Sequence, residues 1–296
     1  MKKVVFTGAA VALVTPMNQD GSVNYKKLEE LVEFQIQNGT DAIVACGTTG
    51  ESATLDIDEH IEVIKKTVEF AKGRVPVIAG TGSNDTAFAV KTAALAEQTG
   101  ADAMLVVTPY YNKTSQAGLI AHFTAIANST SLPVILYNVP SRTGTNIKPE
   151  TYKELSKIEN IVATKEASGD ISAVAQIAHL CGEDLNIYSG NDDQIVPIMS
   201  LGGLGVISVL SNVVPQETHD ICQYALDGDF KKATELQLKY LPLVDALFSD
   251  VNPIPVKEAL NIMGYDVGEC RLPLIRMSEA ARKALETEMA KVGLTK

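Results

Sequence analysis

A lysine ends a short apolar run in this sequence. Residues 161–164 (IVAT) are followed directly by Lys165 and Glu166. A lysine in this position can simply extend its ammonium group to solvent. Where the side chain is instead partly removed from water, burial disfavours the charged form and lowers its pKa. A neutral amine can attack a carbonyl carbon and form a Schiff base, whose imine stabilises a carbanion or enamine without a metal. Lys165 is therefore a candidate nucleophile for a carbonyl substrate.

Polar residues with matching chemistry end other apolar runs. Tyr137 closes one of them, and a phenol there could relay protons to and from an imine intermediate. The stretch 47–51 (GTTGE) offers the hydroxyls of Thr48 and Thr49 and backbone N–H groups that could bind a carboxylate. Arg142 carries a guanidinium fork that suits a carboxylate. Taken alone, each could equally be a packed aromatic, an ordinary turn or a surface arginine, so the pattern leaves their roles open.

The elements that must position these residues repeat along the chain. Eight short runs alternate with longer amphipathic segments, and the runs are almost continuously apolar, as parallel strands buried on both faces require. The expected strands are Ala9–Thr15, Ala42–Cys46, Pro76–Gly80, Ala103–Thr108, Pro133–Asn138, Ile161–Glu166, Leu185–Gly190 and Gly205–Ser211. The helices expected between the first five are Tyr25–Gln37, Asp58–Lys72, Thr86–Glu97 and Gln116–Asn128.

Eight strand–helix units favour an α/β fold of the (β/α)8 TIM-barrel type. An open doubly wound sheet is the alternative, but no GxGxxG motif opens the first helix. In a barrel the chemistry lies at the carboxyl ends of the strands, which is where Lys165 and Tyr137 stand. After Ser211 the strand pattern stops, and we expect a catalytic barrel over residues 1–225 and a C-terminal helical domain over 226–296. Its expected helices are Asp229–Phe248, Pro255–Met263 and Ser278–Val292.

Composition excludes several classes of partner. The 296 residues carry a formal net charge of −11, which argues against nucleic acid and against an anionic membrane surface. No apolar run approaches the ~18 residues that a spanning helix needs, and no signal-peptide cleavage pattern follows the N-terminus. We therefore expect a cytoplasmic protein that binds neither nucleic acid nor a membrane.

The cysteines and histidines do not suggest a metal site. The cysteines are far apart without a CxxC motif, which is typical of reduced thiols. The histidines fall on helical stretches, and no HxH or HExxH occurs. These residues are Cys46, Cys181, Cys222, Cys270, His60, His122, His179 and His219.

Five motifs occur together in a fixed order. They are GTTGES (47–52), VTPYYNK (107–113), YNVPSRTG (137–144), KEASGD (165–170) and SGND (189–192). In this order they resemble the dihydrodipicolinate synthase branch of the class I, pyruvate-dependent aldolase family that also contains N-acetylneuraminate lyase. The resemblance covers the expected barrel from about Gly8 to Ser211, and the helical tail also fits.

The resemblance implies a reaction and the residues that perform it. Pyruvate would condense with L-aspartate 4-semialdehyde to give (4S)-4-hydroxy-2,3,4,5-tetrahydrodipicolinate, which feeds diaminopimelate and lysine biosynthesis. Lys165 would form the Schiff base with pyruvate, so that no separate cofactor is needed. Tyr137, Thr48 and Tyr111 would form a proton relay, with Tyr111 reaching across from a neighbouring subunit.

The resemblance also implies how the substrates are held and how the chain associates. Thr49 would bind the pyruvate carboxylate, and Arg142 would bind the carboxylate of the semialdehyde at the entrance. The backbones of Gly190 and Ile207 would line the site. The family is typically a homotetramer, built as a dimer of tight dimers.

One departure from the family concerns regulation. Members that are inhibited by lysine bind it at the tight dimer interface, and this sequence keeps the matching residues Ser52, Ala53, His60, Asn84 and Tyr110. However, Ile57 stands where inhibited bacterial relatives carry His, and Phe88 stands where they carry Glu. The ammonium group of lysine would then lack its anion. We therefore expect feedback inhibition by lysine to be weak or absent.

Two rival functions remain at this point. A sibling aldolase acting on a sugar acid would not be expected to carry an arginine in the YNVPSRTG loop, so Arg142 argues against it. A barrel that has lost catalysis and serves as a binding or structural protein would be free to lose any catalytic residue. Intact Lys165, Tyr137, Thr48 and Tyr111 argue against that class.

Overall fold

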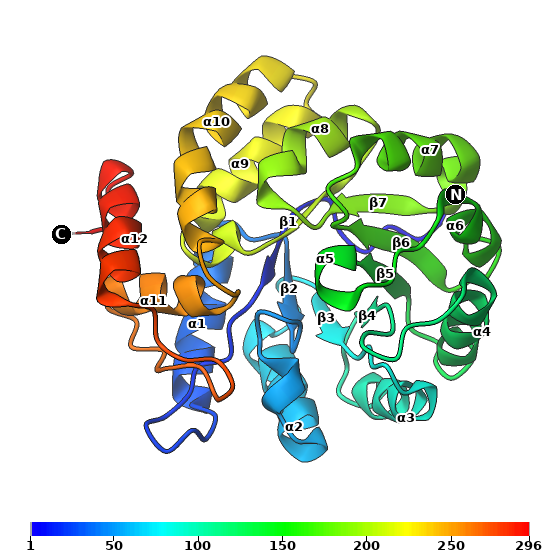
Figure 1. Ribbon diagram of the computed structural model, residues 1–296, viewed down its shortest axis with the longest axis horizontal. Helices are drawn as coiled ribbons and strands as arrows, with labels where there is room; N and C mark the ends of the chain where they lie inside the picture. Colours follow the sequence, from blue (N-terminus) through cyan, green and yellow to red (C-terminus); the bar gives the residue numbers. More distant parts are fainter. Residues whose placement is uncertain (1, 296) are drawn as a thin grey trace.

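A computed structural model describes residues 2–295. Eight parallel strands close into a barrel in the order β1-β2-β3-β4-β5-β6-β7-β8, which confirms the TIM barrel and excludes the open sheet. Figure 1 shows the strands at the centre with helices around them. The strands are β1 Gly8–Ala12, β2 Ala42–Ala45, β3 Val77–Gly80, β4 Ala103–Val107, β5 Val134–Asn138, β6 Ile161–Glu166, β7 Asn186–Ser189 and β8 Gly205–Ser208.

The expected strands all exist and most end within one residue of the prediction, but two end three residues earlier than their apolar runs. β1 stops at Ala12 and β8 at Ser208, whereas the runs continue to Thr15 and Ser211. After β8 the chain forms a 3-10 turn at Leu210–Asn212, whose residues are all buried. Apolar residues beyond a strand end therefore cover the carboxyl end of the barrel instead of extending the sheet, and hydropathy alone does not separate the two.

Five helices around the barrel begin directly after a residue whose side chain caps them. Asn24, Asp56, Asp85, Ser115 and Asp170 each accept a hydrogen bond from a backbone N–H in the first turn of the helix that follows. The helices are α1 Tyr25–Gln37, α2 Ile57–Ala71, α3 Thr86–Glu97, α4 Gln116–Ala127, α5 Pro140–Thr143, α6 Pro149–Leu155, α7 Ile171–Cys181, α8 Ile195–Ser200, α9 Pro215–Leu226, α10 Phe230–Leu247, α11 Ile254–Ile262 and α12 Glu279–Lys291. The four expected barrel helices match α1 to α4 within one residue at each end.

Alternating side chains build two cores on the two sides of the barrel wall. Val134 and Leu136 of β5 pack outward in the layer between strands and helices, whereas Ile135 and Tyr137 point into the barrel. Closure of the barrel demands a glycine where β1 meets β8. Gly205 has φ +150°, and a Cβ there would collide with the carbonyl oxygen of Gly8.

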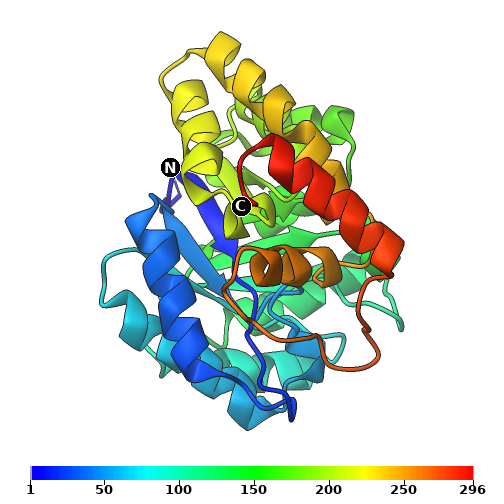
Figure 2. The same cartoon turned by 90° about the vertical axis from the view of Figure 1, so that its left-hand side faces the viewer.

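The secondary-structure elements described in the C-terminal segment are all helices, as expected; loops, the longest over residues 263–278, join them, and the segment packs against the barrel. α10 lies along α8 and α9, and α12 contacts α10 and α11. Figure 2 shows α11 and α12 together on one side of the molecule. The division at 225/226 stays a prediction, with α9 ending at Leu226.

A buried ion pair joins the C-terminal segment to the barrel. Lys257 of α11 donates to the Glu51 carboxylate, which follows β2, at 2.8 Å, and both side chains are 2% exposed. Within residues 2–295, no helix is long and apolar enough to cross a membrane.

Candidate active site

The period of two along a strand turns Lys165 into the barrel. Ala163 of β6 belongs to the inner core, and Lys165 follows it by two residues. On the neighbouring strand Tyr137 has the same relation to Ile135, and the β5–β6 register pairs Tyr137 with Lys165. The Nζ atom of Lys165 lies 4.4 Å from the centroid of the Tyr137 ring. The two residues that the sequence singled out are therefore direct neighbours inside the carboxyl end of the barrel.

The Lys165 amine is buried without a direct anionic partner. The residue is 5% exposed, and no described residue accepts a hydrogen bond from Nζ. The adjacent Glu166 is engaged elsewhere, because its carboxylate accepts hydrogen bonds from Asn138 at 3.1 Å and from the Tyr152 hydroxyl at 2.8 Å. Lys165 is therefore adjacent to an acidic residue in the sequence but is not paired with it in the structure.

Burial lowers the pKa of Lys165 from its ordinary 10.5 to about 8. The charge of Asp192 acts in the opposite direction, and the nearby Arg142 guanidinium adds to the lowering. An amine with this pKa is substantially neutral near pH 8, so it can act as a nucleophile at a pH that leaves most lysines charged.

The pKa of the Tyr137 phenol is shifted upward, whereas that of Lys165 is shifted downward, and both shifts favour the neutral group. Burial raises its pKa, while Arg142 and the hydroxyl of Thr48 partly offset the shift. The phenol therefore holds its proton near neutral pH, as a group that donates and recovers a proton must.

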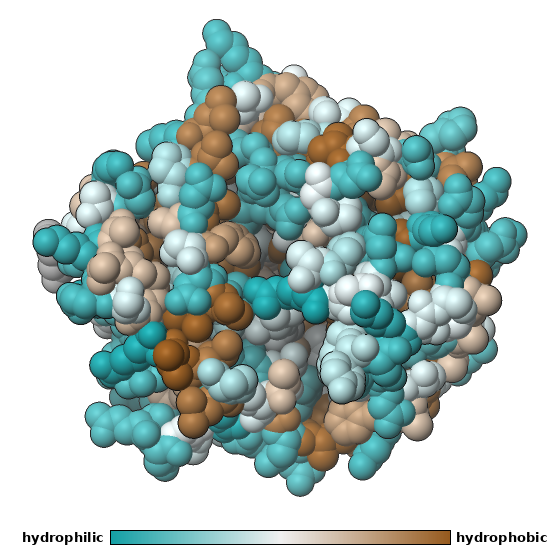
Figure 3. Space-filling model, viewed as in Figure 1, coloured by the Kyte–Doolittle hydropathy of each residue, from teal (hydrophilic) through white to brown (hydrophobic). Residues whose placement is uncertain are grey.

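A cavity of about 440 Å³ collects most of the predicted site residues. Its lining includes Thr48, Thr49, Tyr137, Arg142, Lys165 and Gly190. The hydroxyls come from the loop after β2, the phenol and the guanidinium from β5 and α5, and the amine from β6. The space-filling view shows a hollow near the centre of the face seen in Figure 1 (Figure 3).

Two predicted residues do not line this cavity. Tyr111 lies on the loop after β4, is 91% exposed and has φ +69°. Ile207 is a fully buried residue of β8 that packs inside the barrel. The single chain therefore assembles six of the eight predicted residues around one space.

Sequence reasoning missed the contribution of the C-terminal segment. Val251 and Asn252, between α10 and α11, line the cavity together with Phe248 and Asp250. Asn252 donates through Nδ2 to the Thr49 hydroxyl at 2.9 Å. Nothing local in the sequence marks this asparagine, because its contact spans 203 positions. Asp192 was also left without a role, although the SGND motif contains it.

Asp192 is a buried carboxylate that holds the loop after β8. Its Oδ2 accepts from the backbone N–H groups of Val209 and Leu210 at 3.0 and 2.9 Å. Burial raises its pKa, and the hydrogen bonds from Ser208, Leu210 and Val209 oppose that shift. It fixes the geometry of the barrel end beside Lys165.

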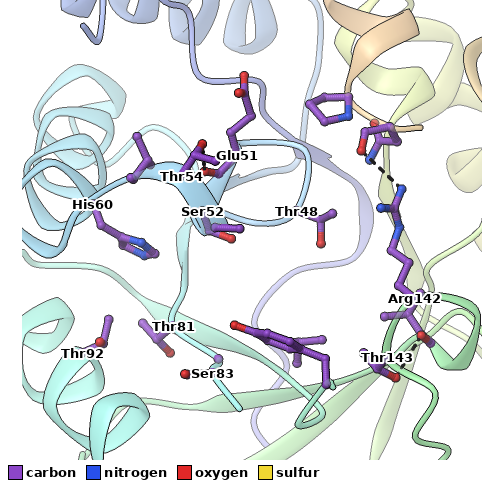
Figure 4. A pocket seen from close by; sticks show the side chains of 18 of the residues that line it. Thr48, Glu51, Ser52, Thr54, His60, Thr81, Ser83, Thr92, Arg142 and Thr143 are labelled. Atoms are coloured by element: carbon purple, nitrogen blue, oxygen red, sulfur yellow. Dashed lines mark hydrogen bonds between the residues drawn. The ribbon is translucent and has the colours of Figure 1, made fainter. Parts of the chain in front are cut away.

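A second cavity of about 510 Å³ adjoins the first (Figure 4). Both cavities share Thr48, Arg142 and Asn252 in their walls. The second cavity also contains six of the seven residues of the expected inhibitor region: Ser52, Ala53, His60, Tyr110 and the two departing residues Ile57 and Phe88. Asn84 does not line it and borders a smaller cavity with His122.

The histidines take no part in the site with Lys165. They lie on α2, α4, α7 and α9, as the sequence predicted. His60 Nε2 lies 2.7 Å from the carbonyl oxygen of Gly80, and burial lowers its pKa. Among residues 2–295, no group of three His, Cys, Asp or Glu side chains is arranged to hold a metal ion.

Comparison with known proteins assigns this geometry to one family. The family model described as "Dihydrodipicolinate synthetase family" matches residues 5–292. A curated 4-hydroxy-tetrahydrodipicolinate synthase of Lachnoclostridium phytofermentans is 61% identical, with 98% of this chain and 99% of the relative covered.

Solved structures agree over the same length. The dihydrodipicolinate synthase of Aquifex aeolicus superposes with a TM-score of 0.95 at 46% identity, covering 98% of this chain and 99% of the other. A chloride-inhibited dihydrodipicolinate synthase from Acinetobacter baumannii, complexed with pyruvate, gives 0.96 at 43% identity, covering 98% and 100%. The agreement spans both the barrel and the helical segment.

Proposed function

The chain belongs to the dihydrodipicolinate synthetase family, and we propose that Lys165 carries the family's condensation of pyruvate with L-aspartate 4-semialdehyde as a covalent imine. The reaction is that of an aldolase-type lyase of diaminopimelate and lysine biosynthesis, with (4S)-4-hydroxy-2,3,4,5-tetrahydrodipicolinate as product. The observation that carries the proposal is the buried, unpaired Lys165 amine with a pKa of about 8, 4.4 Å from the Tyr137 ring centroid.

The first half of the reaction makes a nucleophile from pyruvate. The neutral Lys165 amine attacks C2 of pyruvate, and loss of water from the carbinolamine gives the protonated imine. The imine nitrogen withdraws electrons from the adjacent methyl group, which loses a proton and becomes an enamine. No redox step occurs, so the protein needs to supply only an amine and proton-transfer groups.

Tyr137 and Thr48 are suited to move those protons. The phenol lies beside Nζ, and the Thr48 hydroxyl lowers the pKa of Tyr137 against the effect of burial. Tyr137 would protonate the departing hydroxyl of the carbinolamine and later recover the proton.

Thr49 and Arg142 are suited to hold the two carboxylates. Thr49 is buried in the wall of the cavity that Lys165 also lines, and it would bind the carboxylate of pyruvate. Arg142 lies where the two cavities meet, and its guanidinium would bind the carboxylate of the semialdehyde. The enamine then attacks the aldehyde carbon, and the amino group of the semialdehyde displaces Lys165 as the ring closes. The backbone of Gly190 would complete the lining, whereas Ile207 packs inside the barrel below it and is not part of the cavity wall.

We further propose that the active protein is a homotetramer, a dimer of tight dimers, in the cytoplasm. Tyr111 supports the association, because it is 91% exposed and outside the cavity of its own chain. In this arrangement Tyr111 completes the proton relay of a neighbouring subunit. Mixing two inactive variants tests it: Tyr111→Phe and Lys165→Ala chains should together regain activity, whereas a relay within one chain predicts no recovery.

The central test combines trapping with kinetics. Borohydride reduction in the presence of pyruvate should leave a mass adduct on Lys165, which peptide mass spectrometry locates. Arg142→Ala should raise the KM for the semialdehyde about 10- to 100-fold, as expected for a lost charge-assisted hydrogen bond, with the pyruvate KM little changed. Adduct formation without condensation would keep the imine chemistry and point to another aldehyde, with sugar acids tested next. Failure to form any adduct would overturn the proposal.

A further inference from the structure

Asn252 joins two parts of the site that the barrel alone leaves separate. It lies in the C-terminal segment, just before α11, and is 5% exposed. Its Nδ2 donates to the Thr49 hydroxyl at 2.9 Å, and its backbone carbonyl accepts from the Arg142 guanidinium at 3.4 Å. Figure 4 marks the contact from Arg142 with a dashed line. One residue therefore contacts both groups to which the proposed function assigns a substrate carboxylate.

The hydrogen bond to Thr49 has a direction that matters. A hydroxyl has one proton, and it can accept from a neighbour while donating that proton elsewhere. Because the Asn252 amide is the donor, the Thr49 oxygen is engaged as an acceptor and its proton is left free to donate into the cavity. A carboxylate can only accept, so this orientation prepares Thr49 for the carboxylate of pyruvate.

Asn252 is itself held firmly. The neighbouring α11 carries Lys257, whose ion pair with Glu51 is buried, and Glu51 also accepts from the backbone N–H of Arg271 at 2.8 Å. Glu51 is two residues beyond Thr49 in the chain. The C-terminal segment thus forms hydrogen bonds with the GTTGE loop at two residues, Thr49 and Glu51.

The other end of the Asn252 amide strengthens the case for a role in the site. Its Oδ1 is buried and has no hydrogen-bond partner among residues 2–295. A buried amide retained purely for stability would be expected to satisfy its oxygen as well as its nitrogen, since an unsatisfied acceptor is costly. Asn252 keeps this unpaired oxygen and lies in the walls of both cavities, which fits a role in the site.

From these contacts we propose that Asn252 is a positioning residue of the active site, which orients the Thr49 hydroxyl toward pyruvate and steadies Arg142. The inference rests on the proposed function, because it acts through the carboxylate-binding roles given to Thr49 and Arg142. It assigns the C-terminal helical segment a part in substrate binding.

The test uses two substitutions of Asn252 in the full-length protein. Asn252→Ala removes the donor, and Asn252→Asp keeps the shape but makes the side chain an acceptor that would draw the Thr49 proton away from the cavity. We expect the pyruvate KM to rise about tenfold in the first variant and at least as much in the second. The semialdehyde KM should rise by a smaller factor, and kcat should change less than either KM.

Asn261 provides the matched control. It is an asparagine on α11 whose Nδ2 donates to Gly268 and whose Oδ1 accepts from the backbone N–H of Val267, away from the cavity with Lys165. Asn261→Asp should lower the midpoint of thermal unfolding without changing the pyruvate KM. If Asn252→Asp behaves like Asn261→Asp, with a lower unfolding midpoint and an unchanged KM, Asn252 is only structural and the inference is wrong.

A double-mutant cycle with Thr49→Val makes the mechanism specific. Without the Thr49 hydroxyl, Asn252→Ala should raise the pyruvate KM less than about twofold, because the group it orients is gone. Independent, multiplicative effects would contradict the inference. Failure of the proposed function is recognised separately, since the parent protein would then form no pyruvate adduct on Lys165 and show no condensation.

Discussion

Two buried lysines occupy opposite electrostatic situations in this protein. Lys165 ends β6 inside the barrel and is 5% exposed, and no described residue accepts a hydrogen bond from its amine. Lys257 lies on α11, is 2% exposed, and donates to the Glu51 carboxylate at 2.8 Å and to the Glu269 carbonyl at 2.7 Å. Burial is therefore common to both, and the presence of a directly bonded anion distinguishes them.

The difference separates chemistry from structure. Lys257 bonds a carboxylate directly and thereby joins two parts of the chain. A buried lysine without one is easier to deprotonate, and its pKa falls to about 8 in the case of Lys165. At the barrel end, the buried Lys165 has no bonded anion, which is unfavourable for stability but provides a nucleophile. In the C-terminal segment, Lys257 is paired with Glu51 and holds the GTTGE loop in place.

The largest expected effect comes from changing the nucleophile while keeping the cation. Lys165→Arg retains a positive charge, but a guanidinium does not lose its proton in proteins and cannot form the imine. Condensation should fall by at least about 10³-fold, or roughly 4 kcal/mol of transition-state stabilisation. Steady-state rates measure this, with circular dichroism to establish that the variant is folded. Activity within tenfold of the parent would show that Lys165 is not the nucleophile.

The paired lysine should show the reverse pattern. Lys257→Met leaves the Glu51 carboxylate buried without its cation, and the free energy of unfolding should fall by about 3–5 kcal/mol. Urea denaturation measures the loss, and the folded protein should still form the pyruvate adduct on Lys165.

Removing the stranded charge provides the control for Lys257. The double variant Lys257→Met with Glu51→Gln should recover part of the stability, because the amide can still accept from the backbone of Arg271. A cost below about 1 kcal/mol for Lys257→Met alone would mean that the ion pair is replaceable by apolar packing.

Lys165→Met should instead stabilise the protein, in a way that depends on pH. Below about pH 8 the amine is protonated in both states, so the folded protein bears the full cost of a buried ammonium. Between about 8 and 10.5 the unfolded chain binds more protons, so the stability of the parent rises with pH and the cost disappears. The lowering of the Lys165 pKa from 10.5 to about 8 corresponds to a destabilisation of the folded protein on the order of 3 kcal/mol at pH 7.

The measurement is a series of urea denaturations from pH 7 to pH 10. Lys165→Met should exceed the parent in stability at pH 7, and the gap should close as the pH rises past 8. Lys257→Met serves as the comparison, because it should remain less stable than the parent from pH 7 to 9. A gap that is constant with pH would mean that packing, not charge, causes the difference.

The same contrast explains how far the sequence could lead. Lys165 and Tyr137 were predictable because strand periodicity and the end of an apolar run place both side chains inside one end of a barrel. Asn252 was not, because it reaches Thr49 from 203 residues away on a segment whose sequence shows only helices. The early ends of β1 and β8 were also missed, since hydropathy does not tell a strand from a buried turn.

The smallest expected effect concerns a third cation, free L-lysine, in the second cavity. Phe88 is 45% exposed in the wall of that cavity, together with Ile57, and an apolar ring there offers an ammonium no anion. Initial rates with saturating pyruvate should therefore stay above half of the uninhibited rate at about 1 mM lysine. This corresponds to a binding free energy for lysine no more favourable than about −4 kcal/mol. The double variant Ile57→His with Phe88→Glu should increase sensitivity to lysine by about tenfold or less, because a half-exposed carboxylate is screened by water. Phe88→Gln in place of Glu is the uncharged control and should not. Half-inhibition of the parent at sub-millimolar lysine would contradict the prediction. It would mean that this cavity binds an ammonium group without a carboxylate beside it, and a directly bonded carboxylate is what distinguishes Lys257 from Lys165.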